Sequence, residues 1–408
     1  MEKVRGERCV LLKFGELALK GRNRPLFVNA LERNLRRLTS DLGPLEVRHR
    51  GGVLIVTADV AEEALVERCL ALPGVSVVQP ALRCERDAAA GADAAVALLR
   101  GRPGNTFAVR SRRRDKRFPL RSIELSRVIG DAVRLRLGLD VDLSNPDLEV
   151  FVEVDHKELL VSRVRLRGAG GLPVGSSGRA LVLLSGGLDS PVAAYRMMKR
   201  GLRCDFVHFS GRPFTGPESV YKAYALAGRL DKFQGDSRLF VVSFGTAQRR
   251  LATAGAGRLQ VLSQRRLMVK VASELGRRDG AEALVTGDSL GQVASQTLPN
   301  LAVVEEAAGL PVLRPLIDRD KSEIVDIAKQ LGTYEISILP DEDCCQLFSS
   351  KLAVTRGHTD ELRQIERTAD IEEIVDGLVE SAELHHPHLK ETRPEPLAVG
   401  LSSPGKPR

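Results

Sequence analysis

The sequence predicts a multi-domain α/β protein, and three observations support this fold class. The chain of 408 residues has room for two to four domains at roughly 100–200 residues per domain. Short apolar runs alternate with longer stretches of helical periodicity. A segment rich in Gly and Ser, residues 166–178, lacks periodicity and predicts a linker. We therefore expect mixed helix-and-strand units before the linker and a doubly wound parallel sheet after it.

Two successive units are expected before the linker. In residues 1–60, a strand at 8–14, an amphipathic helix at 25–38 and a hairpin at 45–58 predict a small α+β domain, with the hairpin turning at Gly51 and Gly52. In residues 61–165, helices and strands alternate again, which predicts an α/β domain. Its expected helices are 61–71, 87–99 and 122–137, and its expected strands are 75–83, 105–111, 149–155 and 159–165.

Residues 179–350 carry a stronger alternation, which predicts parallel strands joined by helical crossovers. The expected strands are 180–184, 204–209, 239–244, 282–286 and 311–314, and the expected helices are 191–200, 217–230, 258–277 and 321–331. Ligands of such sheets bind at the carboxyl ends of the strands. Residues 351–408 are expected to form a helical extension, with a helix near 358–383, and a flexible tail.

Composition predicts a cytoplasmic protein that does not enter a membrane. No apolar run approaches the roughly 18 residues that a membrane helix needs, and the first residues, MEKVRGER, lack the apolar core of a signal peptide. The six cysteines include no C-x-x-C pair and no disulfide framework, which agrees with a reducing compartment.

The positive charge is concentrated before the linker. Residues 1–178 contain 31 Lys and Arg against 23 Asp and Glu, whereas residues 179–408 contain 30 of each, so the whole net charge of +8 lies in the first part. One run from Arg110 to Arg117 has six cations in eight residues: Arg110, Arg112, Arg113, Arg114, Lys116 and Arg117. The run alone is equally compatible with a solvated loop and with contacts to a phosphate backbone.

The stretch LVLLSGGLDSPVAAY, residues 181–195, predicts a strand, a glycine turn and the start of a helix. Ser185, Gly186 and Gly187 can turn backbone N–H groups toward an anion at the positive end of the helix dipole, and Ser190 can cap the helix. No lysine follows the glycines as it does in G-x-x-x-x-G-K-[ST] loops, and Asp189 occupies that region. A phosphate site of a different kind is expected.

The loop resembles the SGGxDS signature of the PP-loop ATP pyrophosphatases. Further stretches resemble one branch, the tRNA 4-thiouridine synthases (tRNA sulfurtransferases), in order over about residues 8–348: KFGELALKGRNRPLF, RRRDKRFP, GAGGLPVGSSG, VLSQRRLM, TGDSLGQVASQTLPN, VLRPLIDRDKSEI and ISILPDEDCCQLF. The resemblance implies an N-terminal ferredoxin-like domain (1–60), a THUMP RNA-binding domain (61–165) and a PP-loop domain (179–350). It also implies transfer of sulfur to uridine 8 of tRNA, with the basic run contacting tRNA, and a role in thiamine thiazole synthesis.

The resemblance also implies how ATP is used. The uridine C4 oxygen would be adenylated with release of pyrophosphate, Asp189 would help hold Mg²⁺, and Lys321 would stabilise charge on the transferring phosphate. The implied ATP-binding residues are Leu183, Leu184, Ser185, Gly186, Gly187, Asp189, Ser190, His208, Phe209, Arg265, Gly287 and Gln296. Without the resemblance, His208 is a satisfied histidine at a strand edge, Phe209 a core residue and Lys321 an ordinary surface lysine.

Cys344 and Cys345 supply the sulfur chemistry in this interpretation. A persulfide on Cys345, or on Cys344 as the close second, would attack C4 and expel AMP. Cys344 or Cys204 could resolve the mixed intermediate. The 63 residues after Cys345 contain no cysteine, so no rhodanese domain is expected there and a cysteine desulfurase would deliver the sulfur. An iron–sulfur cluster on Cys204, Cys344 and Cys345 is not favoured because C-x-x-C spacing is missing.

Two other functions remain open from the sequence. One is a PP-loop enzyme that adenylates a small acceptor or a carrier protein, and the other is a catalytically silent tRNA-binding protein. Ser185, Asp189, Lys321 and Cys345 argue against the silent protein because all four belong to the expected chemistry. A homodimer is compatible with the sequence.

Overall fold

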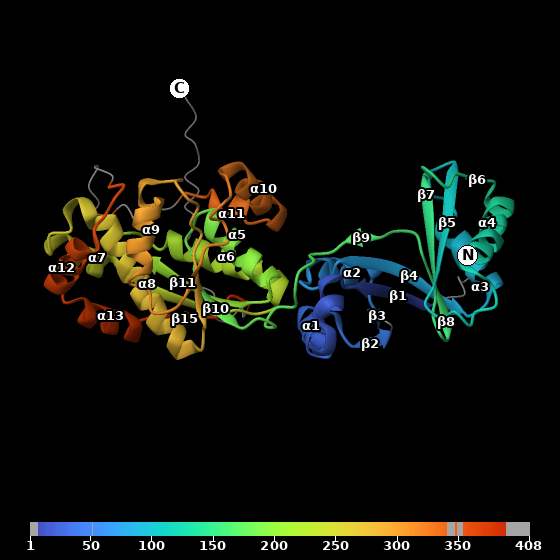
Figure 1. The fold of residues 1–408 in the computed structure, drawn as a ribbon, viewed down its shortest axis with the longest axis horizontal. Coiled ribbons are helices and arrows are strands. Elements are labelled where there is room, and N and C mark those ends of the chain that lie inside the picture. Colours follow the sequence, from blue (N-terminus) through green and yellow to red (C-terminus); the bar gives the residue numbers. More distant parts are fainter. Residues whose placement is uncertain (1–6, 51, 341–346, 349–353, 389–408) are drawn as a thin grey trace, which may run out of the picture. The chain divides into compact units, whose positions relative to one another are not determined.

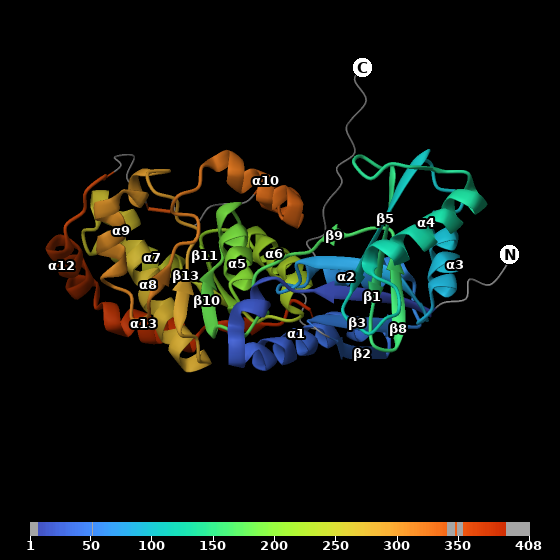
Figure 2. The same cartoon turned by 45° about the vertical axis from the view of Figure 1, so that its right-hand side comes forward.

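The computed structural model describes residues 7–50, 52–340, 347–348 and 354–388. The chain forms two compact units (Figures 1 and 2). Unit 1 consists of Met1–Ser177 with Met198–Arg203 and Lys232–Gly235, and unit 2 consists of Gly178–Met197, Cys204–Asp231 and Asp236–Arg408. The expected linker therefore ends where unit 1 gives way to unit 2.

Unit 1 contains one nine-stranded sheet. Its strands are β1 (Glu7–Lys13), β2 (Leu45–Arg50), β3 (Val53–Ala58), β4 (Val77–Glu85), β5 (Thr106–Arg113), β6 (Asp140–Val141), β7 (Leu148–Val154), β8 (Glu158–Ser162) and β9 (Leu166–Arg167). Its helices are η1 (Glu16–Asn23), α1 (Arg24–Leu38), η2 (Ser40–Leu42), α2 (Glu62–Ala71), α3 (Ala88–Leu99) and α4 (Ser122–Leu137). The strand order is β2-β3-β1-β4-β8-β7-β5-β6, with β9 paired to β4.

The first part of this sheet has the ferredoxin-like pattern. The elements β1, α1, β2, β3, α2 and β4 follow one another along the chain, and β1 lies between β3 and β4, antiparallel to both. Alternate residues of β1 face opposite sides: Val10 and Leu12 pack with Leu31 and Leu35 of α1, whereas Cys9 and Leu11 join a separate cluster. This confirms the expected ferredoxin-like fold class.

The second part of the sheet continues from β4 without a break. β4 pairs with β8, β8 with β7, and β7 lies parallel to β5. Helices α3 and α4 cover this part and share a core with the strands, in which Phe107, Ile129 and Val150 are fully buried. The domain boundary expected at residue 60 stays a prediction, and Leu65 and Cys69 of α2 pack in the core of the first part.

Unit 2 contains a six-stranded sheet in the order β14-β13-β10-β11-β12-β15. The strands are β10 (Arg179–Leu183), β11 (Arg203–Ser210), β12 (Leu239–Ser243), β13 (Ala283–Val285), β14 (Val312–Leu313) and β15 (Glu383–His385). The helices are α5 (Asp189–Lys199), α6 (Glu218–Gln234), α7 (Gly245–Thr253), η3 (Gly257–Leu259), α8 (Gln260–Asp279), η4 (Ala294–Gln296), α9 (Leu298–Glu305), α10 (Lys321–Leu331), α11 (Tyr334–Ser337), α12 (Thr359–Ala369) and α13 (Ile371–Glu380). The expected doubly wound sheet is confirmed, with β15 as an antiparallel edge strand.

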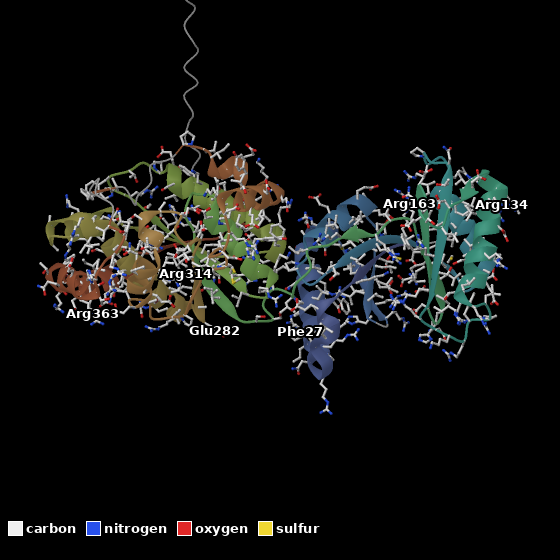
Figure 3. All side chains as sticks on the ribbon, turned by 45° about the horizontal axis from the view of Figure 1, so that its top comes forward. Phe27, Arg134, Arg163, Glu282, Arg314 and Arg363 are labelled. Carbon is white, nitrogen blue, oxygen red and sulfur yellow. The ribbon has the colours of Figure 1, made fainter. Side chains whose placement is uncertain are left out.

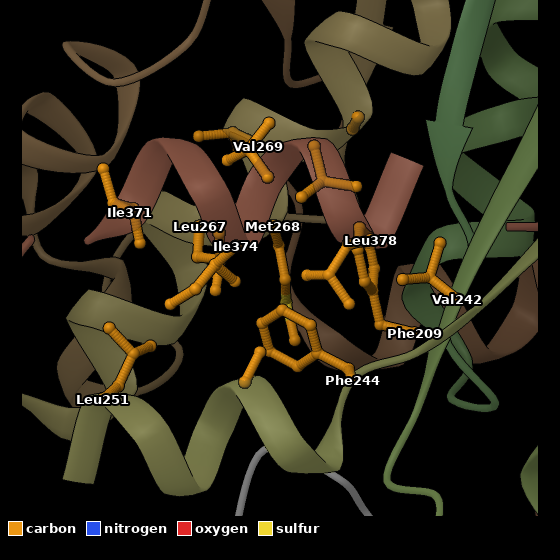
Figure 4. Packing of buried hydrophobic residues seen from close by; sticks show 14 of the residues in the cluster. Phe209, Val242, Phe244, Leu251, Leu267, Met268, Val269, Ile371, Ile374 and Leu378 are labelled. Atoms are coloured by element: carbon orange, nitrogen blue, oxygen red, sulfur yellow. The ribbon is translucent and has the colours of Figure 1, made fainter. Parts of the chain in front are cut away.

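The C-terminal helices belong to the core of unit 2. The single helix expected near 358–383 is two helices, because Asp370 adopts a left-handed conformation (φ 56°) between α12 and α13. Ile374 and Leu378 of α13 pack against Met268 of α8 and Phe244, as Figure 4 shows. Each such buried side chain contributes about 1.5–3 kcal/mol. The helical extension thus covers one side of α8 and stabilises the fold around the site.

Candidate functional site

The strand order of the unit 2 sheet reverses between β10 and β13. The chain runs from β10 through β11 to β12, then returns to β13 on the other side of β10 and continues to β14. In a doubly wound sheet, the carboxyl ends of the strands at such a reversal border the crevice that binds ligands. The candidate site therefore lies where the segments after β10 and β13 meet.

These two segments approach closely at Gly287, which follows β13. A Cβ atom at position 287 would lie 2.8 Å from the backbone nitrogen of Ser190 and 2.9 Å from the carbonyl carbon of Asp189. A side chain does not fit at that separation, so glycine at this position lets the β13 segment pack against the first turn of α5. The expected contact of Gly287 with a nucleotide stays a prediction.

The loop SGGLDS, residues 185–190, joins β10 to α5 and is organised by its two serines. The hydroxyl of Ser190 accepts from the N–H of Ser185 at 2.9 Å, and Ser185 Oγ accepts from the N–H of Gly187 at 3.2 Å. Ser190 lies in the first turn of α5, so its hydroxyl closes the loop and does not occupy the expected N-cap position. Gly186 is buried, whereas Ser185 and Gly187 are exposed at the positive end of α5, where an anion is stabilised.

Asp189 and Lys321, which are 132 residues apart in the sequence, meet beside this loop. Lys321, the first residue of α10, donates from Nζ to Oδ1 of Asp189 at 2.7 Å, and Gln292 donates to Oδ2 at 3.2 Å. The side chains of Lys321 and Asp189 are 48% and 23% exposed, so a ligand can reach both. The start of α10 is fixed by Asp320, whose carboxylate accepts from the N–H of Glu323 at 3.0 Å.

His208 and Phe209 lie at the end of β11 and are both buried. His208 Nδ1 lies 2.9 Å from the carbonyl oxygen of Leu184, and Nε2 lies 3.1 Å from Ser219 Oγ. Because a carbonyl only accepts, Nδ1 carries the proton in the neutral ring and Nε2 accepts from the serine. Phe209 packs edge-on against Phe244, with ring centroids 5.2 Å apart.

Leu183 and Leu184 end β10 and begin the loop. The N–H of Leu184 donates to the carbonyl oxygen of Val207 at 2.8 Å, and its own carbonyl is the partner of His208. Both backbone polar groups of Leu184 therefore already have protein partners. The expected contacts of Leu183, Leu184, His208 and Phe209 with a nucleotide stay predictions, and a hydrogen bond links two of these four residues, Leu184 and His208.

Arg265 and Gln296 meet at Asp288, a residue that sequence reasoning missed. Arg265 on α8 donates to Oδ1 of Asp288, and Gln296 Nε2 donates to the same oxygen at 3.3 Å. Arg265 also donates to the carbonyl oxygen of Ser295 at 2.9 Å. The signal that could have identified Asp288 is its place directly after a predicted strand, at the edge of the sheet where ligands bind.

Cys344 and Cys345 lie outside the described residues, but both flanks of the pair contact the site. Before it, Ser337 donates from its hydroxyl to the carbonyl oxygen of Gly187 at 3.2 Å. After it, the carbonyl oxygen of Leu347 accepts from Gln264 of α8 at 3.0 Å, and Phe348 packs edge-on against Phe214. The described flanks are therefore anchored to the glycine loop, to α8 and to the segment after β11.

The buried ammonium of Lys222 holds the first of these flanks. Its Nζ donates to the carbonyl oxygens of Ser337 at 3.1 Å and Leu339 at 2.7 Å. Two carbonyl oxygens disperse the lysine charge and fix the end of α11 against α6.

Cys204 lies on β11 with its side chain fully buried. Its Sγ lies 3.9 Å from the carbonyl oxygen of Ala194 on α5. The other described cysteines, Cys9, Cys69 and Cys84, are also buried, and burial raises the pKa of each thiol to about 12. Such thiols carry almost no thiolate at neutral pH and are poor nucleophiles.

The basic run in unit 1 divides into structural and exposed cations. Arg110, Arg112 and Arg113 lie on β5, and the run continues into the following turn. Arg113 donates to the carbonyl oxygens of Lys116, Phe118 and Leu120, and so holds this turn closed. Arg112 and Lys116 are exposed, and their side chains make no hydrogen bond or ion pair within the part of the chain that the structure describes.

The remaining cations of the run pair with carboxylates. Arg117 and Arg110 are exposed and pair with Asp115 at 3.0 Å and with Glu149. Hydrogen bonds from the Arg117 side chain and backbone hold the pKa of Asp115 well below its usual value. Arg114 donates from Nε to the buried Glu153 at 2.8 Å, and Glu153 also pairs with Lys13 of β1. Arg114 is therefore part of the fold.

The described residues bear on two further sequence expectations. No helix there is long and apolar enough to cross a membrane. Across the same residues, no group of three or more His, Cys, Asp or Glu side chains is arranged to hold a metal ion.

Three family descriptions match successive parts of the chain. Residues 9–78 match the ThiI ferredoxin-like domain, residues 92–164 match the THUMP domain, and residues 175–371 match the family described as thiamine biosynthesis protein (ThiI). The first two matches cover the two parts of the unit 1 sheet, and the third begins three residues before unit 2.

Whole-chain relatives carry one common description. A probable tRNA sulfurtransferase of Nocardia farcinica is 53% identical over 380 residues, which cover 91% of this chain and 92% of the relative. A probable tRNA sulfurtransferase of Caldanaerobacter subterraneus is 40% identical over 372 residues, which cover 91% of this chain and 98% of the relative. Among solved structures, a 4-thiouridine synthetase in complex with RNA and bound ATP matches with a TM-score of 0.86 at 32% identity, over 93% of this chain and 99% of the other.

Proposed function

The chain belongs to the ThiI family of tRNA sulfurtransferases, and we infer that it transfers sulfur to tRNA in an ATP-dependent reaction. The observation that carries this function is the sequence identity of 53% between this chain and a probable tRNA sulfurtransferase, over about nine-tenths of both proteins. The site agrees with it, since a glycine loop, a carboxylate and a lysine meet at the reversal of the sheet. We further infer that the product is 4-thiouridine at position 8.

The first half-reaction is adenylation of the uridine. The C4 oxygen attacks the α-phosphorus of ATP, an O–P bond forms, the bond between the α-phosphorus and its bridging oxygen breaks, and pyrophosphate leaves. The positive end of α5, beside Ser185 and Gly187, suits the departing pyrophosphate, and the N–H groups of these two residues now donate to the serine hydroxyls of the loop. Lys321 stands beside Asp189 and supplies the positive charge that the loop itself lacks.

The site suits a Mg²⁺ ion that is bound together with the phosphates of ATP. Mg²⁺ binds proteins through one or two carboxylates together with substrate phosphates, and Asp189 is the partly exposed carboxylate at the loop. Its oxygens now accept from Lys321 and Gln292. The ion would add charge neutralisation for the departing pyrophosphate, and Lys321 would then turn from Asp189 toward phosphate oxygens.

The second half-reaction replaces oxygen by sulfur. We infer that a persulfide on Cys345, with Cys344 as the alternative, attacks C4. A C–S bond forms, the C4–O bond breaks and AMP leaves with the oxygen. A second thiol then attacks the cysteine sulfur of the S–S bond, which releases thiolated uridine and leaves a disulfide that an external thiol reduces. The anchored flanks at Ser337 and Leu347 support a role for this segment at the loop.

The resolving thiol is better sought at Cys344 than at Cys204. Cys204 is fully buried, so it meets the mixed intermediate only after local opening of the sheet. The same burial argues against Cys204 as a ligand of an iron–sulfur cluster.

The sulfur is expected to come from a cysteine desulfurase. The described cysteines are buried, and the pKa of Cys9, Cys69 and Cys84 is raised by burial, so these thiols are unsuited to collect sulfur from solution. A donor protein that carries a persulfide avoids this requirement. A homodimer and a cytoplasmic location, where tRNA is modified, remain predictions.

A cell that lacks the protein tests the function. Mass analysis of nucleosides from its tRNA should show no 4-thiouridine, and a plasmid copy should restore it. Persistence of 4-thiouridine in the deleted cell would contradict the proposed function. Adenylation of a small acceptor or silent tRNA binding is not favoured by the relatives, whose descriptions name sulfur transfer to tRNA.

A second role in thiamine synthesis is favoured by one observation. The family that matches residues 175–371 is described as a thiamine biosynthesis protein. Sulfur transfer for the thiazole ring would use the same persulfide. The deleted cell should then require thiamine, and growth without it would limit the protein to tRNA.

A further inference from the structure

Asp288 is a buried carboxylate beside the glycine loop and takes no part in the two half-reactions. It lies three residues after the end of β13, and only 5% of its surface is exposed. The hydroxyl of Thr286 donates to its Oδ2 at 2.8 Å. A buried carboxylate requires positive partners, and these come from two other segments of unit 2.

The positive partners of Asp288 are two guanidinium groups. Arg265, on α8, donates to Oδ1, and Arg314, which follows β14, lies 3.4 Å from Oδ2 through its Nε. The two arginine side chains are 16% and 11% exposed. Arg314 has a second carboxylate, Glu305, but that partner is 53% exposed and therefore screened by water. Asp288 is thus the buried anion shared by both guanidinium groups.

The shared carboxylate also fixes an amide. Gln296 of η4 donates from Nε2 to Oδ1 at 3.3 Å. Its remaining atom Oε1 is buried and has no hydrogen-bond partner among the described residues, and the same is true of Nη2 of Arg314. Buried polar atoms without a partner are uncommon and indicate a missing ligand or water. One acceptor and one donor therefore remain for a ligand in the network around Asp288.

This network adjoins the glycine loop through the backbone. Gly287, the residue before Asp288, is the position whose Cβ would lie 2.8 Å from the nitrogen of Ser190. Because Gly287 is bonded to Asp288 and packs on the first turn of α5, a shift of the Asp288 backbone would also move Gly287 against that turn. Arg314 and Lys321 are likewise joined by a short connection, which lies between β14 and α10 and contains no helix or strand.

We propose that Asp288 is a positioning residue for ATP binding. Its carboxylate holds Arg265 and Gln296 in the orientation that the nucleotide needs. The proposal rests on the proposed function, because Arg265 and Gln296 are nucleotide contacts only within it. Asp288 itself does not touch the reacting atoms. Its role is to fix both side chains before the nucleotide arrives, so that less ordering is needed on binding.

Unit 2 contains a matched control for the alternative, a purely structural ion pair. Asp205 on β11 is 3% exposed, and it accepts from Arg179 and Arg238 at 2.9 Å each. Like Asp288, it is a buried carboxylate between two guanidinium groups, and here Asp279 pairs with the same two arginines. Arg179 begins β10 and Arg238 precedes β12, so this cluster lies at the amino ends of the strands, opposite the site.

The test compares Asp288→Asn with Asp205→Asn in the full chain. For each protein, the KM for ATP and the kcat are measured in tRNA-dependent pyrophosphate release, together with the melting temperature. Asp288→Asn should raise the KM for ATP about tenfold or more, with a smaller change in kcat, because an amide presents N–H groups to the guanidinium of Arg265. Asp205→Asn should lower the melting temperature and leave the KM unchanged.

A conservative variant separates charge from packing. Asp288→Glu keeps the negative charge, so its KM should lie between those of the wild type and Asp288→Asn, and it serves as the test protein if Asp288→Asn does not fold. A wild-type KM in Asp288→Asn, or an equal increase in Asp205→Asn, would overturn the proposal. Absence of pyrophosphate release from the wild type would contradict the proposed function itself, which is a different outcome.

Discussion

At the scale of single residues, the site depends on a carboxylate and a lysine that the fold brings together. Asp189 follows the glycine loop directly, and Lys321 begins a helix 132 residues later, with their charged atoms 2.7 Å apart. The loop lacks a lysine of its own, so the positive charge comes from α10. We therefore expect the chemistry at this site to require both residues.

Removing either charge should stop adenylation and spare tRNA binding. For Asp189→Asn and Lys321→Met, we expect tRNA-dependent pyrophosphate release to fall about 100-fold or more. Asp189→Asn removes the carboxylate that would hold Mg²⁺, and Lys321→Met removes a positive charge at the transferring phosphate. The affinity for tRNA, measured by filter binding, should remain that of the wild type. Gln292→Ala is the control, since it removes a neutral contact to Asp189 and should cost much less. Wild-type turnover in Lys321→Met would remove this lysine from the mechanism.

The two half-reactions should separate at the cysteines. Cys345→Ala should keep pyrophosphate release and lose 4-thiouridine, because alanine has no sulfur to carry. Cys344→Ala should slow turnover with repeated cycles if that thiol resolves the intermediate. Cys69→Ala, which changes a fully buried thiol, should leave both reactions intact. If Cys344→Ala alone abolishes the product, the assignment of the two cysteines is reversed.

Sequence reasoning at this scale found residues that belong to motifs and missed those that do not. Asp189 was found because the SGGLDS loop has a recognisable order, and Lys321 because a family motif contains it. Asp288 is a single acidic residue after a strand, and only the folded chain brings Arg265, Arg314 and Gln296 to it. His208 and Phe209 are both buried, which agrees with a satisfied histidine at a strand edge and a core phenylalanine, as the residue types alone suggest.

At the scale of secondary-structure elements, β5 and the turn after it carry both arginines that stabilise the fold and cations that are exposed to solvent. Arg113 and Arg114 stabilise the turn and the buried Glu153, whereas Arg112 and Lys116 are exposed. Neutralising the whole run would therefore confuse loss of tRNA binding with loss of structure.

The double variant Arg112→Gln with Lys116→Gln isolates the tRNA contact. We expect weaker tRNA binding and a salt dependence whose slope falls by about 1 to 2, since each lost phosphate contact removes counterion release. The control is Arg277→Gln with Arg278→Gln, which removes equal charge from exposed positions on α8 in unit 2. Equal slopes for the two variants would make the run an ordinary solvated surface.

The buried carboxylate of β7 predicts a pH dependence of unit 1. Burial alone raises the pKa of Glu153, but the hydrogen bond from Lys13 and the charge of Arg114 outweigh it and lower the pKa below its usual 4.5. Its stabilisation is therefore present above pH 4.5 and is lost as the pH falls through the lowered value.

Glu153→Gln measures this contribution. At pH 7 we expect it to lower the free energy of opening of β7 by about 3 kcal/mol, because two cations lose a buried partner, and amide hydrogen exchange reports this value. The difference from the wild type should shrink below pH 4.5. Glu149→Gln, on the same strand in an exposed pair with Arg110, should cost less than about 1 kcal/mol. A difference for Glu153→Gln that is constant with pH would contradict this account.

Most long elements followed from periodicity, and the short ones did not. Strands β1, β10 and β11 and helices α1, α4 and α8 lie near their expected positions. Helix α9 was missed because its apolar side chains are not confined to one face of the helix, and β15 because three residues carry no pattern. The break between α12 and α13 depends on the backbone of Asp370, which the continuous helical pattern conceals.

At the scale of the whole molecule, the two units differ in net charge and in sheet topology. The excess of positive charge lies before residue 179, and the reversal of strand order that makes a nucleotide crevice lies after it. Charged side chains cover both units in Figure 3, where Arg134 marks unit 1 and Arg314 marks unit 2. The proposed function joins these features into one reaction, in which we expect unit 1 to bind RNA and unit 2 to activate it with ATP.

The measurement that tests this account most directly is reconstitution with the purified chain. The protein, ATP, Mg²⁺, unmodified tRNA and a persulfide donor are combined, and pyrophosphate and 4-thiouridine are quantified together. The account predicts one pyrophosphate released for each 4-thiouridine formed, with neither product in the absence of ATP. Formation of 4-thiouridine without ATP, or pyrophosphate release that does not depend on tRNA, would contradict it.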